Sequence, residues 1–421
     1  MKYLLKNASQ IVTADTSGKN YKLKDQLKEL NVISEHSILI ENGIIKDIIP
    51  AKSRRKTNHD AEIDLADKVV LPGIVECHTH TAFAGSRADE FRQKLIGITY
   101  EQIAAAGGGI NKTVQSVRQA SFDDLVSLIQ PRINYFISQG VTTLEIKSGY
   151  GLSYYDEIKL LQVINHLNKF NKIDIIPTFL GAHTYPPEYK NDHEKYIDII
   201  VSELIPFIKE KKLAVFCDAF CEKTAFTAED VDLIFTHAVK NGLKPKLHTE
   251  QFNSIGGLQT ALKHNAVSVD HLEVIRKEDI SLLKDKETVA VLLPGVSYFL
   301  NYDYAPAREL INNGVIVALA TDYNPGSSHI SNISMIMSLV ALKMNMKIEE
   351  IINAYTINAA KALDISKQTG SIEIGKKADF SVYNTKEYSD IIYNVGKNIN
   401  CMTIKNGEII FKANKDNYEN N

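Results

Sequence analysis

The sequence predicts an α/β protein, a (β/α)₈ TIM barrel that carries a small β-sandwich domain built from both chain termini. Eight near-continuous apolar segments alternate with helical segments through the middle of the 421-residue chain, and strand patterns with Asn-Gly turns stand near each end. Strands of a parallel sheet are buried on both faces, so they read as apolar runs. A doubly wound sheet is the alternative, but it rarely needs eight such units in sequence.

Each end of the chain carries a hairpin signal, in which Asn-Gly separates two apolar strands. The first hairpin turns at Asn42-Gly43 and the second at Asn406-Gly407. We therefore expect both ends to build one domain. The expected division is residues 1–70 and 365–421 for the β-sandwich domain and residues 71–364 for the TIM barrel.

The middle of the chain predicts the barrel strands and most of the helices between them. The expected strands are Val69–His80, Thr142–Lys147, Ile173–His183, Leu213–Cys221, Pro245–Glu250, Ala266–Glu273, Thr288–Pro294 and Val315–Asp322. The expected helices are one that starts after Asp156 and others near 193–211, 228–241, 256–264, 277–285, 305–313, 331–344 and 348–363.

Charge and composition exclude several kinds of partner. The formal net charge is −3 and no basic run exceeds a few residues, so nucleic acid is not expected. No apolar segment approaches the ~20 residues of a membrane span, and the N-terminus lacks the apolar core of a signal peptide. Four cysteines in so long a chain make no disulfide framework. We expect a cytoplasmic protein that binds no nucleic acid and no membrane.

The first barrel strand ends in two histidines one residue apart, His78 and His80. Side chains alternate along a strand, so Glu76, His78 and His80 share one face, and two imidazoles there can bind one metal ion. This pattern alone is weak evidence, because exposed strand ends often carry two histidines by chance.

Polar residues at the other strand ends strengthen the metal interpretation. Histidines stand at the ends of strands three, five and six, and an aspartate stands at the end of strand eight: His183, His248, His271 and Asp322. The active site of such a barrel lies at the carboxyl ends of its strands, where these side chains would meet. The sequence therefore predicts a metal site there. The remaining histidines fall in loops or helices, where a surface position is the simpler interpretation, and His329 is left open.

Several longer motifs carry a resemblance to a known family. They are Glu145-Ile146-Lys147-Ser148-Gly149-Tyr150-Gly151, Thr178-Phe179-Leu180-Gly181-Ala182-His183, Asp270-His271-Leu272-Glu273 and Thr321-Asp322-Tyr323-Asn324-Pro325-Gly326. Together with the strand-end histidines, they make the chain resemble the amidohydrolase superfamily and, within it, the imidazolonepropionase family of histidine degradation.

The resemblance implies His78, His80, His248 and Asp322 as ligands of one divalent ion, zinc or iron. Binuclear relatives bridge two ions through a modified lysine on strand four. Strand four here, Leu213 to Asp218, contains no lysine, so we expect one metal ion per chain. Lys147 on strand two is interpreted as structural or as part of the pocket wall.

The resemblance also implies the reaction, in which a metal-activated water opens the ring of 4-imidazolone-5-propanoate to N-formimidoyl-L-glutamate. Asp322 accepts a proton and His271 steadies the oxyanion or relays a proton. Many relatives place a glutamate acid/base where this chain has Gln251, which is expected to hydrogen-bond the ring. Glu250 is expected to point away from the site.

The substrate carries a carboxylate, and the resemblance assigns it to Arg87, whose guanidinium can bind a carboxylate bidentately. Further substrate-binding residues implied in the same way are Tyr150, His183, Gln251, Asn324, Gly326 and Ser327. A homodimer is expected by resemblance only. For Arg87 the alternative is an ordinary surface ion pair, and for Tyr150 a core aromatic.

Two other functions compete with this interpretation. The first is a mononuclear amidohydrolase that deaminates a purine or pyrimidine base, which would use the same metal residues and release ammonia. Gln251 speaks against it, because a deaminase must deliver a proton to its leaving amine. The second is a non-catalytic metal-binding barrel, and the complete ligand set speaks against that.

Overall fold

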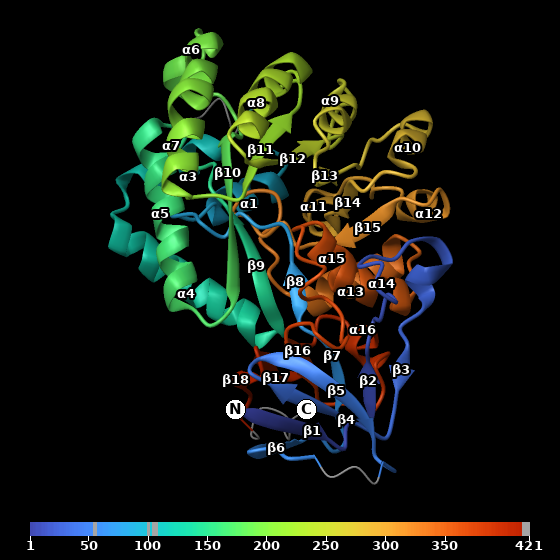
Figure 1. The fold of residues 1–421 in the computed structure, drawn as a ribbon. Helices are drawn as coiled ribbons and strands as arrows, with labels where there is room; N and C mark the ends of the chain where they lie inside the picture. The colour runs from blue at the N-terminus through green and yellow to red at the C-terminus, as the bar shows by residue number, and fades with distance from the viewer. Residues whose placement is uncertain (54–56, 99–101, 103–107, 415–421) are drawn as a thin grey trace.

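The barrel is an eight-stranded parallel sheet whose strands follow one another in chain order (Figure 1). The structure, a computed structural model, describes residues 1–53, 57–98, 102 and 108–414. The barrel strands are β8 (Ile74–Glu76), β9 (Val141–Lys147), β10 (Asp174–Ala182), β11 (Phe216–Cys221), β12 (Lys244–Thr249), β13 (Ser268–His271), β14 (Val289–Leu292) and β15 (Ile316–Leu319). A parallel bridge between Thr79 and Tyr323 joins the two end strands just beyond their carboxyl ends. The predicted fold class is confirmed.

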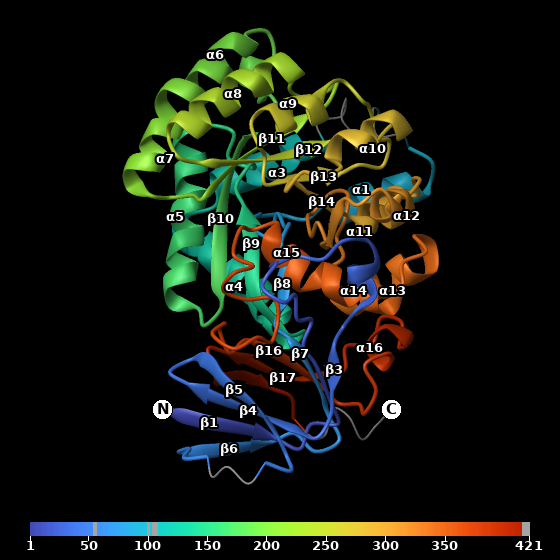
Figure 2. The ribbon, with the colours of Figure 1, turned by 45° about the vertical axis from the view of Figure 1, so that its right-hand side comes forward.

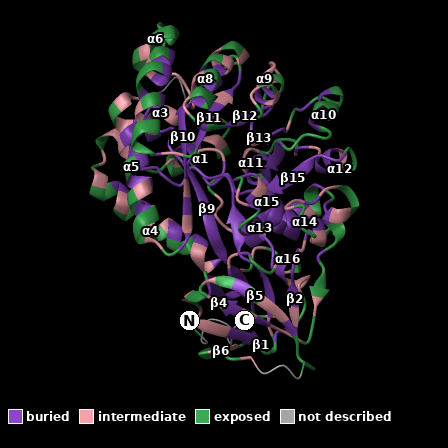
Figure 3. Ribbon diagram, in the orientation of Figure 1, coloured by how far each residue is buried: buried purple, intermediate pink, exposed green. Residues whose placement is uncertain are grey.

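Helices surround the barrel, and their buried faces cover its strands (Figures 1 and 3). The helices are α1 (Ala88–Leu95), α3 (Ile110–Gln119), α4 (Phe122–Ser138), α5 (Tyr154–Phe170), α6 (His193–Asp198), α7 (Ile205–Lys211), α8 (Ala228–Lys240), α9 (Gly257–Lys263), α10 (Lys277–Leu283), α11 (Pro294–Leu300), α12 (Ala307–Asn312), α13 (Ile333–Lys343), α14 (Ile348–Tyr355) and α15 (Ile357–Lys361). A π-helical segment, Ile199–Leu204, joins α6 to α7. No helix in the described part of the chain is long and apolar enough to cross a membrane.

Two smaller sheets lie below the barrel and combine strands from both ends of the chain (Figure 2). The first contains β1 (Lys2–Lys6), β4 (His36–Glu41), β5 (Ile44–Pro50) and β6 (Ala61–Asp64). The second contains β2 (Gln10–Val12), β3 (Val32–Ile33), β7 (Val69–Pro72), β16 (Phe380–Tyr383), β17 (Asn400–Lys405) and β18 (Glu408–Lys412), and the short helix α16 (Asp390–Tyr393) follows β16. Residues such as Ile38, Val70 and Phe380 form one apolar core between the two sheets.

Both Asn-Gly hairpins are confirmed, β4–β5 and β17–β18. Asn42 and Asn406 adopt positive φ, as does the glycine that follows each, which is the geometry of a two-residue hairpin turn. The two turns also contact each other: a Cβ added at Gly43 would lie 3.1 Å from the Asn406 carbonyl oxygen. The two ends of the chain are therefore joined at their turns as well as through the shared core.

The predicted single strand Val69–His80 is wrong, because it is two strands in two sheets. β7 pairs with β2 and β16, whereas β8 pairs with β9. The chain crosses between the sheets at Gly73, where an added Cβ would lie 2.2 Å from Thr142 Oγ1. Only glycine fits so close an approach, so the Pro72-Gly73 break is a crossing point between sheets. His78 and His80 follow β8 rather than lying within it.

The observed helices differ from the predicted ones in two places. The residues between β8 and β9 form α1, α3 and α4, which the sequence analysis did not locate; α4 contains Pro131 in its interior. The predicted helix at 348–363 is two helices, α14 and α15, interrupted at Thr356, whose ψ of −93° lies outside the helical range.

Candidate metal centre and active site

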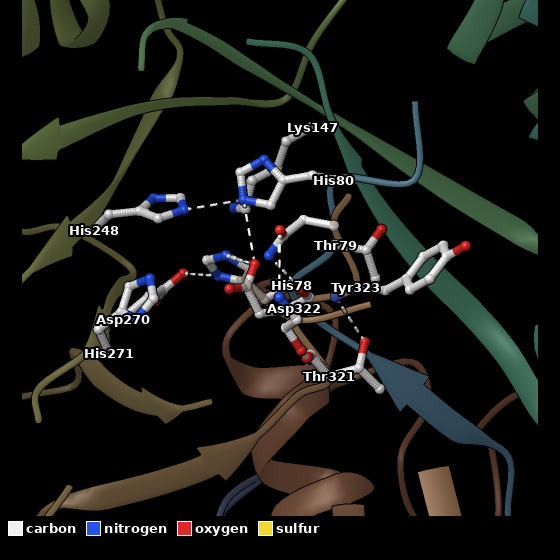
Figure 4. Close-up of polar contacts among 12 residues, drawn as sticks. His78, Thr79, His80, Lys147, His248, Asp270, His271, Thr321, Asp322 and Tyr323 are labelled. Carbon is white, nitrogen blue, oxygen red and sulfur yellow. Dashed lines mark hydrogen bonds and ion pairs between the residues drawn. The ribbon is translucent and has the colours of Figure 1, made fainter. Parts of the chain in front are cut away.

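The carboxyl ends of the barrel strands bring together the histidines and the aspartate that the sequence singled out (Figure 4). His78 and His80 follow β8, His248 is the fifth residue of β12, His271 ends β13, and Asp322 follows β15. Each of these residues is at most 3% exposed. Side chains from distant parts of the chain thus form one buried cluster.

The nitrogen and oxygen atoms of this cluster converge closely. His80 Nε2 lies 3.2 Å from His248 Nε2 and 3.4 Å from Asp322 Oδ1. His78 Nε2 lies 3.5 Å from Asp322 Oδ1. Two overlapping groups have ligand atoms within 4.8 Å of one another: His78, His80 and Asp322, and His78, His248 and His271. The four residues predicted to hold a metal are therefore neighbours, and His271 adjoins them.

Two carboxylates contact the Nδ1 atoms of two of the imidazoles, on the side of each ring that faces away from the cluster. Asp270 Oδ2 lies 2.6 Å from Nδ1 of His78, and Asp218 Oδ1 lies 3.1 Å from Nδ1 of His248. An imidazole that donates from Nδ1 to a carboxylate presents its Nε2 lone pair on the opposite side of the ring. Both rings are thereby oriented with Nε2 toward the cluster.

Lys147, which is buried inside the barrel, forms an ion pair with one of these two carboxylates, Asp218. Its fully buried ammonium donates to Asp218 Oδ2 at 2.8 Å and lies 2.9 Å from Glu145 Oε2. Burial lowers the pKa of Lys147, but Asp218, Glu145 and Asp270 outweigh it, so the net shift is upward. Lys147 is therefore a charged partner beneath the histidines, which agrees with the structural interpretation and not with a position in the pocket wall.

Burial also sets the charge of the imidazoles. It lowers the pKa of His78 and His80 well below the usual range, and it lowers that of His248 to about 4 despite the opposing effect of Asp218. These rings are neutral at neutral pH, which is the form that binds a metal ion.

Some buried atoms of the cluster have no hydrogen-bond partner in the described part of the chain, and these fit a cation. They include His78 Nε2 and Asp322 Oδ1. Buried polar atoms normally have partners, so unpaired ones that face each other indicate a missing ligand. Three imidazole nitrogens and one carboxylate oxygen are a donor set that zinc or iron accepts, with a position left for water. The residues therefore fit a divalent metal ion.

His271 differs from the other histidines. Burial lowers its pKa, but Glu273, Asp322 and Asp270 outweigh burial and raise the net value. Its Nδ1 lies 3.4 Å from Glu273 Oε1. Burial raises the pKa of Asp322 to about 7, opposed by His271. The cluster thus contains a histidine and an aspartate whose pKa values are both raised, in contrast to the lowered values of the other three histidines.

Tyr150 and His183 form one wall beside the metal cluster. The His183 ring stacks on the His80 ring with centroids 5.0 Å apart, and the Tyr150 ring lies 5.3 Å from His183 and 5.9 Å from His80. His183 Nδ1 donates to the Gly149 carbonyl oxygen at 2.9 Å. Both predicted pocket residues therefore lie beside His80, and Tyr150 is at the same time a buried member of the hydrophobic core.

Arg87 lines a cavity of about 370 Å³ that Phe83, Tyr323, Gly326 and His329 also border. Its Nε donates to Glu90 Oε2 at 2.8 Å, and its side chain is 9% exposed. A Cβ added at Gly326 would lie 2.2 Å from Arg87 Nη1, so the guanidinium packs directly on that glycine. The ion pair of Arg87 is therefore buried rather than exposed, and His329 belongs to the cavity wall without contacting the metal cluster.

Asn324 shapes the turn that carries Gly326 and Ser327. Its side-chain oxygen accepts from the backbone N–H groups of Gly326 and Ser327 at 2.8 and 2.7 Å, and its amide donates to the Asp322 carbonyl at 2.8 Å. The turn is thus tied to the backbone of Asp322 and lies beside Arg87, whose guanidinium packs on Gly326.

Gln251 is buried and lies two residues beyond the end of β12. Glu250 is also buried, and its φ of +56° means that it does not continue the extended strand. Burial raises its pKa to about 7. The expectation that Glu250 points away from the site stays a prediction.

The sequence analysis did not assign the carboxylates behind the imidazoles, Asp218 and Asp270. A signal was present, because each is a charged residue within a barrel strand: Asp218 is the third of six residues in β11, and Asp270 is the next to last residue of β13. Which histidine each one supports depends on the register between neighbouring strands, and that is visible only in the structure.

Comparison with solved structures finds proteins that share this fold. An adenosine deaminase from Xanthomonas campestris with bound zinc aligns with a TM-score of 0.72 at 16% identity, covering 97% of this chain and 92% of that one. A triazine hydrolase variant aligns with a TM-score of 0.74 at 14% identity, covering 98% and 95%. At these identities the likeness concerns the fold.

Sequence comparison defines first the class and then the family. Residues 219–410 match the model of the amidohydrolase family, which together with the barrel and its histidine cluster defines a metal-dependent amidohydrolase. The imidazolonepropionase of Clostridium tetani is 41% identical over 97% of this chain and 98% of its own length, and that of Christiangramia forsetii is 42% identical over 91% and 94%. The chain belongs to the imidazolonepropionase family.

Proposed function

We propose that this protein hydrolyses 4-imidazolone-5-propanoate to N-formimidoyl-L-glutamate, a ring opening in histidine degradation. One observation carries the proposal: curated imidazolonepropionases are about 40% identical to this chain over nearly its whole length, for example 41% over 97% of the chain. The buried cluster of histidines and aspartate lies where the fold places a catalytic centre.

We infer that His78, His80, His248 and Asp322 hold one divalent ion, zinc or iron. The unpaired His78 Nε2 and Asp322 Oδ1 support this ligand set. One ion rather than two is supported by β11, which carries Asp218 but no lysine that could bridge a second ion. An ion bound there would supply Lewis-acid activation of water and of the ring carbonyl.

The proton steps are assigned to the chain's own residues. We assign Asp322 as the group that accepts the proton released by water, because its carboxylate lies among the imidazoles of the cluster. His271, whose pKa is raised, donates a hydrogen bond to the oxygen on which negative charge develops, or passes a proton to the leaving ring nitrogen. Gln251 cannot titrate, so we assign it to hydrogen-bonding the ring.

The opposite end of the substrate is assigned to Arg87. Its guanidinium offers further N–H groups beyond the Nε that donates to Glu90, and these can bind the propionate. Tyr150 and His183 would line the ring, and Asn324, Gly326 and Ser327 would form the turn beside the carboxylate. Glu90 would fix the direction of the guanidinium.

The experiment is direct. Purified protein is mixed with fresh 4-imidazolone-5-propanoate, and loss of the ring absorbance, formation of N-formimidoyl-L-glutamate and metal content are followed together. Ring opening with stoichiometric product supports the proposal. Release of ammonia from a purine or pyrimidine base, without ring opening of the imidazolone, would replace it with a deaminase.

We also propose that the protein works in the cytoplasm as a homodimer. Four buried, unpaired cysteine thiols suit a reducing compartment. Sedimentation equilibrium of the purified protein measures the oligomeric state, and a monomer over the micromolar range would contradict the dimer.

A further inference from the structure

We propose that Glu157 is a positioning residue that holds the segment Ser148–Leu152, called here the Tyr150 segment, in the conformation that the substrate pocket requires. The proposal rests on the function proposed above and adds a residue to that site. Glu157 lies in the first turns of α5, behind the wall that Tyr150 and His183 form, and its side chain is fully buried.

The carboxylate of Glu157 accepts hydrogen bonds from most of the backbone N–H groups of the Tyr150 segment. Its Oε1 accepts from Gly149 N at 3.1 Å, from Gly151 N at 2.8 Å and from Leu152 N at 2.9 Å, and its Oε2 lies 3.1 Å from Gly149 N. These N–H groups are buried and belong to no strand or helix, so without Glu157 they would lose their partner.

The Tyr150 segment needs such a partner because its backbone is unusual. Gly149 has φ of +101° and Leu152, a residue with a side chain, has φ of +49°. A Cβ added at Gly149 would lie 2.9 Å from the Leu180 carbonyl oxygen, and one added at Gly151 would lie 2.5 Å from the backbone of Glu157. This conformation persists only where surrounding contacts determine it.

Arg118 holds the same segment from its other side. Its Nε donates to the Gly151 carbonyl at 2.8 Å and its Nη2 to the Leu152 carbonyl at 2.9 Å, while Glu188 pairs with its Nη2 at 2.7 Å. Glu157 thus binds the N–H groups of the segment and Arg118 binds its carbonyl groups. Both hydrogen-bonding faces of the segment are fixed by side chains that do not touch the metal cluster.

The conformation of the Tyr150 segment affects the substrate pocket through two residues, Tyr150 and His183. The Tyr150 segment carries the Tyr150 ring beside His80, and its Gly149 carbonyl accepts from His183 Nδ1 at 2.9 Å, which orients the ring stacked on His80. Ser148 extends the link, because its side chain hydrogen-bonds Glu157 and accepts from Leu180 N at 3.0 Å on β10. One buried carboxylate therefore sets the positions of both wall residues.

The first test is Glu157→Gln, which keeps the volume but replaces one acceptor oxygen by a donor that faces Gly149 N. Backbone hydrogen exchange of residues 148–153 should accelerate, because the segment opens more often. With 4-imidazolone-5-propanoate, kcat/KM should fall by about 10- to 100-fold, most of it in KM, with metal content unchanged.

The matched control is Glu350→Gln. Glu350 is also fully buried and accepts from Lys347 N at 2.7 Å and from Arg308, but it lies in α14 and has no bond to the Tyr150 segment. The control should lower thermal stability and leave KM and the exchange of residues 148–153 unchanged. Equal effects of the two variants on KM would overturn the positioning role.

A double-mutant cycle separates positioning from general damage. If Glu157 acts through the Tyr150 segment, Tyr150→Phe should reduce kcat/KM less in the Glu157→Gln background than in the wild type. Additive effects would contradict the proposal. Where Glu157→Gln yields no folded protein, Arg118→Met loosens the same segment from a side chain that is 27% exposed, and it should shift KM in the same direction.

The two proposals fail in different ways. A wild type without turnover of the imidazolone would reject the proposed function, while hydrogen exchange would still decide whether Glu157 holds the segment. Normal wild-type turnover, together with Glu157→Gln that exchanges slowly or keeps the wild-type KM, would reject the role of Glu157 alone.

Discussion

Two clusters of charged side chains lie at opposite ends of the barrel, and they differ in how completely the protein satisfies them. The amino-end cluster joins the barrel to the small sheets: Lys405 Nζ lies 2.8 Å from both Asp174 and Asp379, and Asp379 also accepts from Thr369 and from Asn406 N. The carboxyl-end cluster consists of His78, His80, His248, His271 and Asp322 with their supports Asp218, Asp270 and Lys147.

In the described part of the chain, no side-chain atom of Lys405, Asp174 or Asp379 is buried without a partner, whereas His78 Nε2, His80 Nδ1, Asp270 Oδ1 and Asp322 Oδ1 are. Both clusters contain a buried lysine between two carboxylates, so residue types alone do not distinguish them. Between these two clusters, unsatisfied atoms rather than buried charge therefore distinguish the one whose residues fit a metal ion.

Removal of the metal should have the largest effect on the carboxyl-end cluster. We expect about one divalent ion per chain, and a chelator should abolish turnover and lower the melting temperature, because the ion binds the folded chain and stabilises it. Elemental analysis, calorimetry and activity before and after chelation measure this, with zinc or ferrous ion added back as the control. Two tightly bound ions that are both needed for turnover would contradict the single site.

Asp322→Asn tests whether the carboxylate is a base as well as a ligand. The amide keeps the shape but cannot accept a proton, so kcat should fall by about 10²–10⁴-fold while the fold is retained. Circular dichroism and metal content should accompany the kinetics. Near-normal turnover with the metal retained would move the base to another residue.

Arg87→Met separates carboxylate binding from the chemistry at the metal cluster. A charge-assisted hydrogen bond contributes roughly 1.5–3 kcal/mol, so kcat/KM should fall by about ten- to several-hundred-fold, and Arg87→Lys should restore only part of it. Metal content should not change. The comparison substrate is an imidazolone without the carboxylate, and an equal loss on both compounds would show that Arg87 does not bind the propionate.

The sequence could predict those parts of the fold that have a local sequence signal. The barrel followed from apolar runs and the hairpins from Asn42-Gly43 and Asn406-Gly407, because these signals are local. The helix around Pro131 and the crossing at Gly73 were missed: proline usually ends a helix, and the need for glycine depends on Thr142, which is remote in sequence. Local patterns cannot report a contact between distant strands.

The candidate site likewise has a part that the sequence could predict and a part that it could not. Histidines at strand ends can be read from the sequence, because the barrel brings all strand ends together. Their partners could not be assigned: Asp270 supports His78 across 192 residues, and Glu157 acts on backbone groups that carry no sequence signal. The ligand and substrate roles themselves remain predictions that the experiments above address.

Lys147→Met and Lys405→Met compare the two clusters directly. Each lysine is at most 1% exposed and lies 2.8–2.9 Å from two carboxylates. Each substitution removes a buried cation from its carboxylates and should lower the free energy of unfolding. The loss should be about 3–5 kcal/mol for Lys147→Met, where Asp218 and Glu145 are fully buried, and smaller for Lys405→Met, because Asp174 is 35% exposed and keeps its ion pair with Lys377. Only Lys147→Met should also weaken metal binding, by roughly 10- to 100-fold, because Asp218 would no longer be held against His248. Equal metal affinity in both variants would contradict the support by Lys147.

The smallest effect concerns a buried lysine that belongs to neither cluster. Lys22 is 3% exposed, its Nζ donates to the Glu29 carbonyl oxygen, and no carboxylate in the described part of the chain lies within ion-pair distance. Burial lowers its pKa to about 8, against the opposing effect of nearby acids such as Glu29.

The sign of the pH dependence follows from this lowered pKa. The unfolded chain keeps the Lys22 proton up to about pH 10.5, whereas the folded chain releases it near pH 8, so the unfolded state binds more protons between these values. The stability of the wild type relative to Lys22→Met should therefore be constant below pH 8 and increase from pH 8 to 10. Solvent screening limits the gain to about 1–2 kcal/mol. Denaturant unfolding of both proteins at pH 7, 8.5 and 10 measures it, and a difference that stays flat or shrinks would show that Lys22 is not buried as a strained cation.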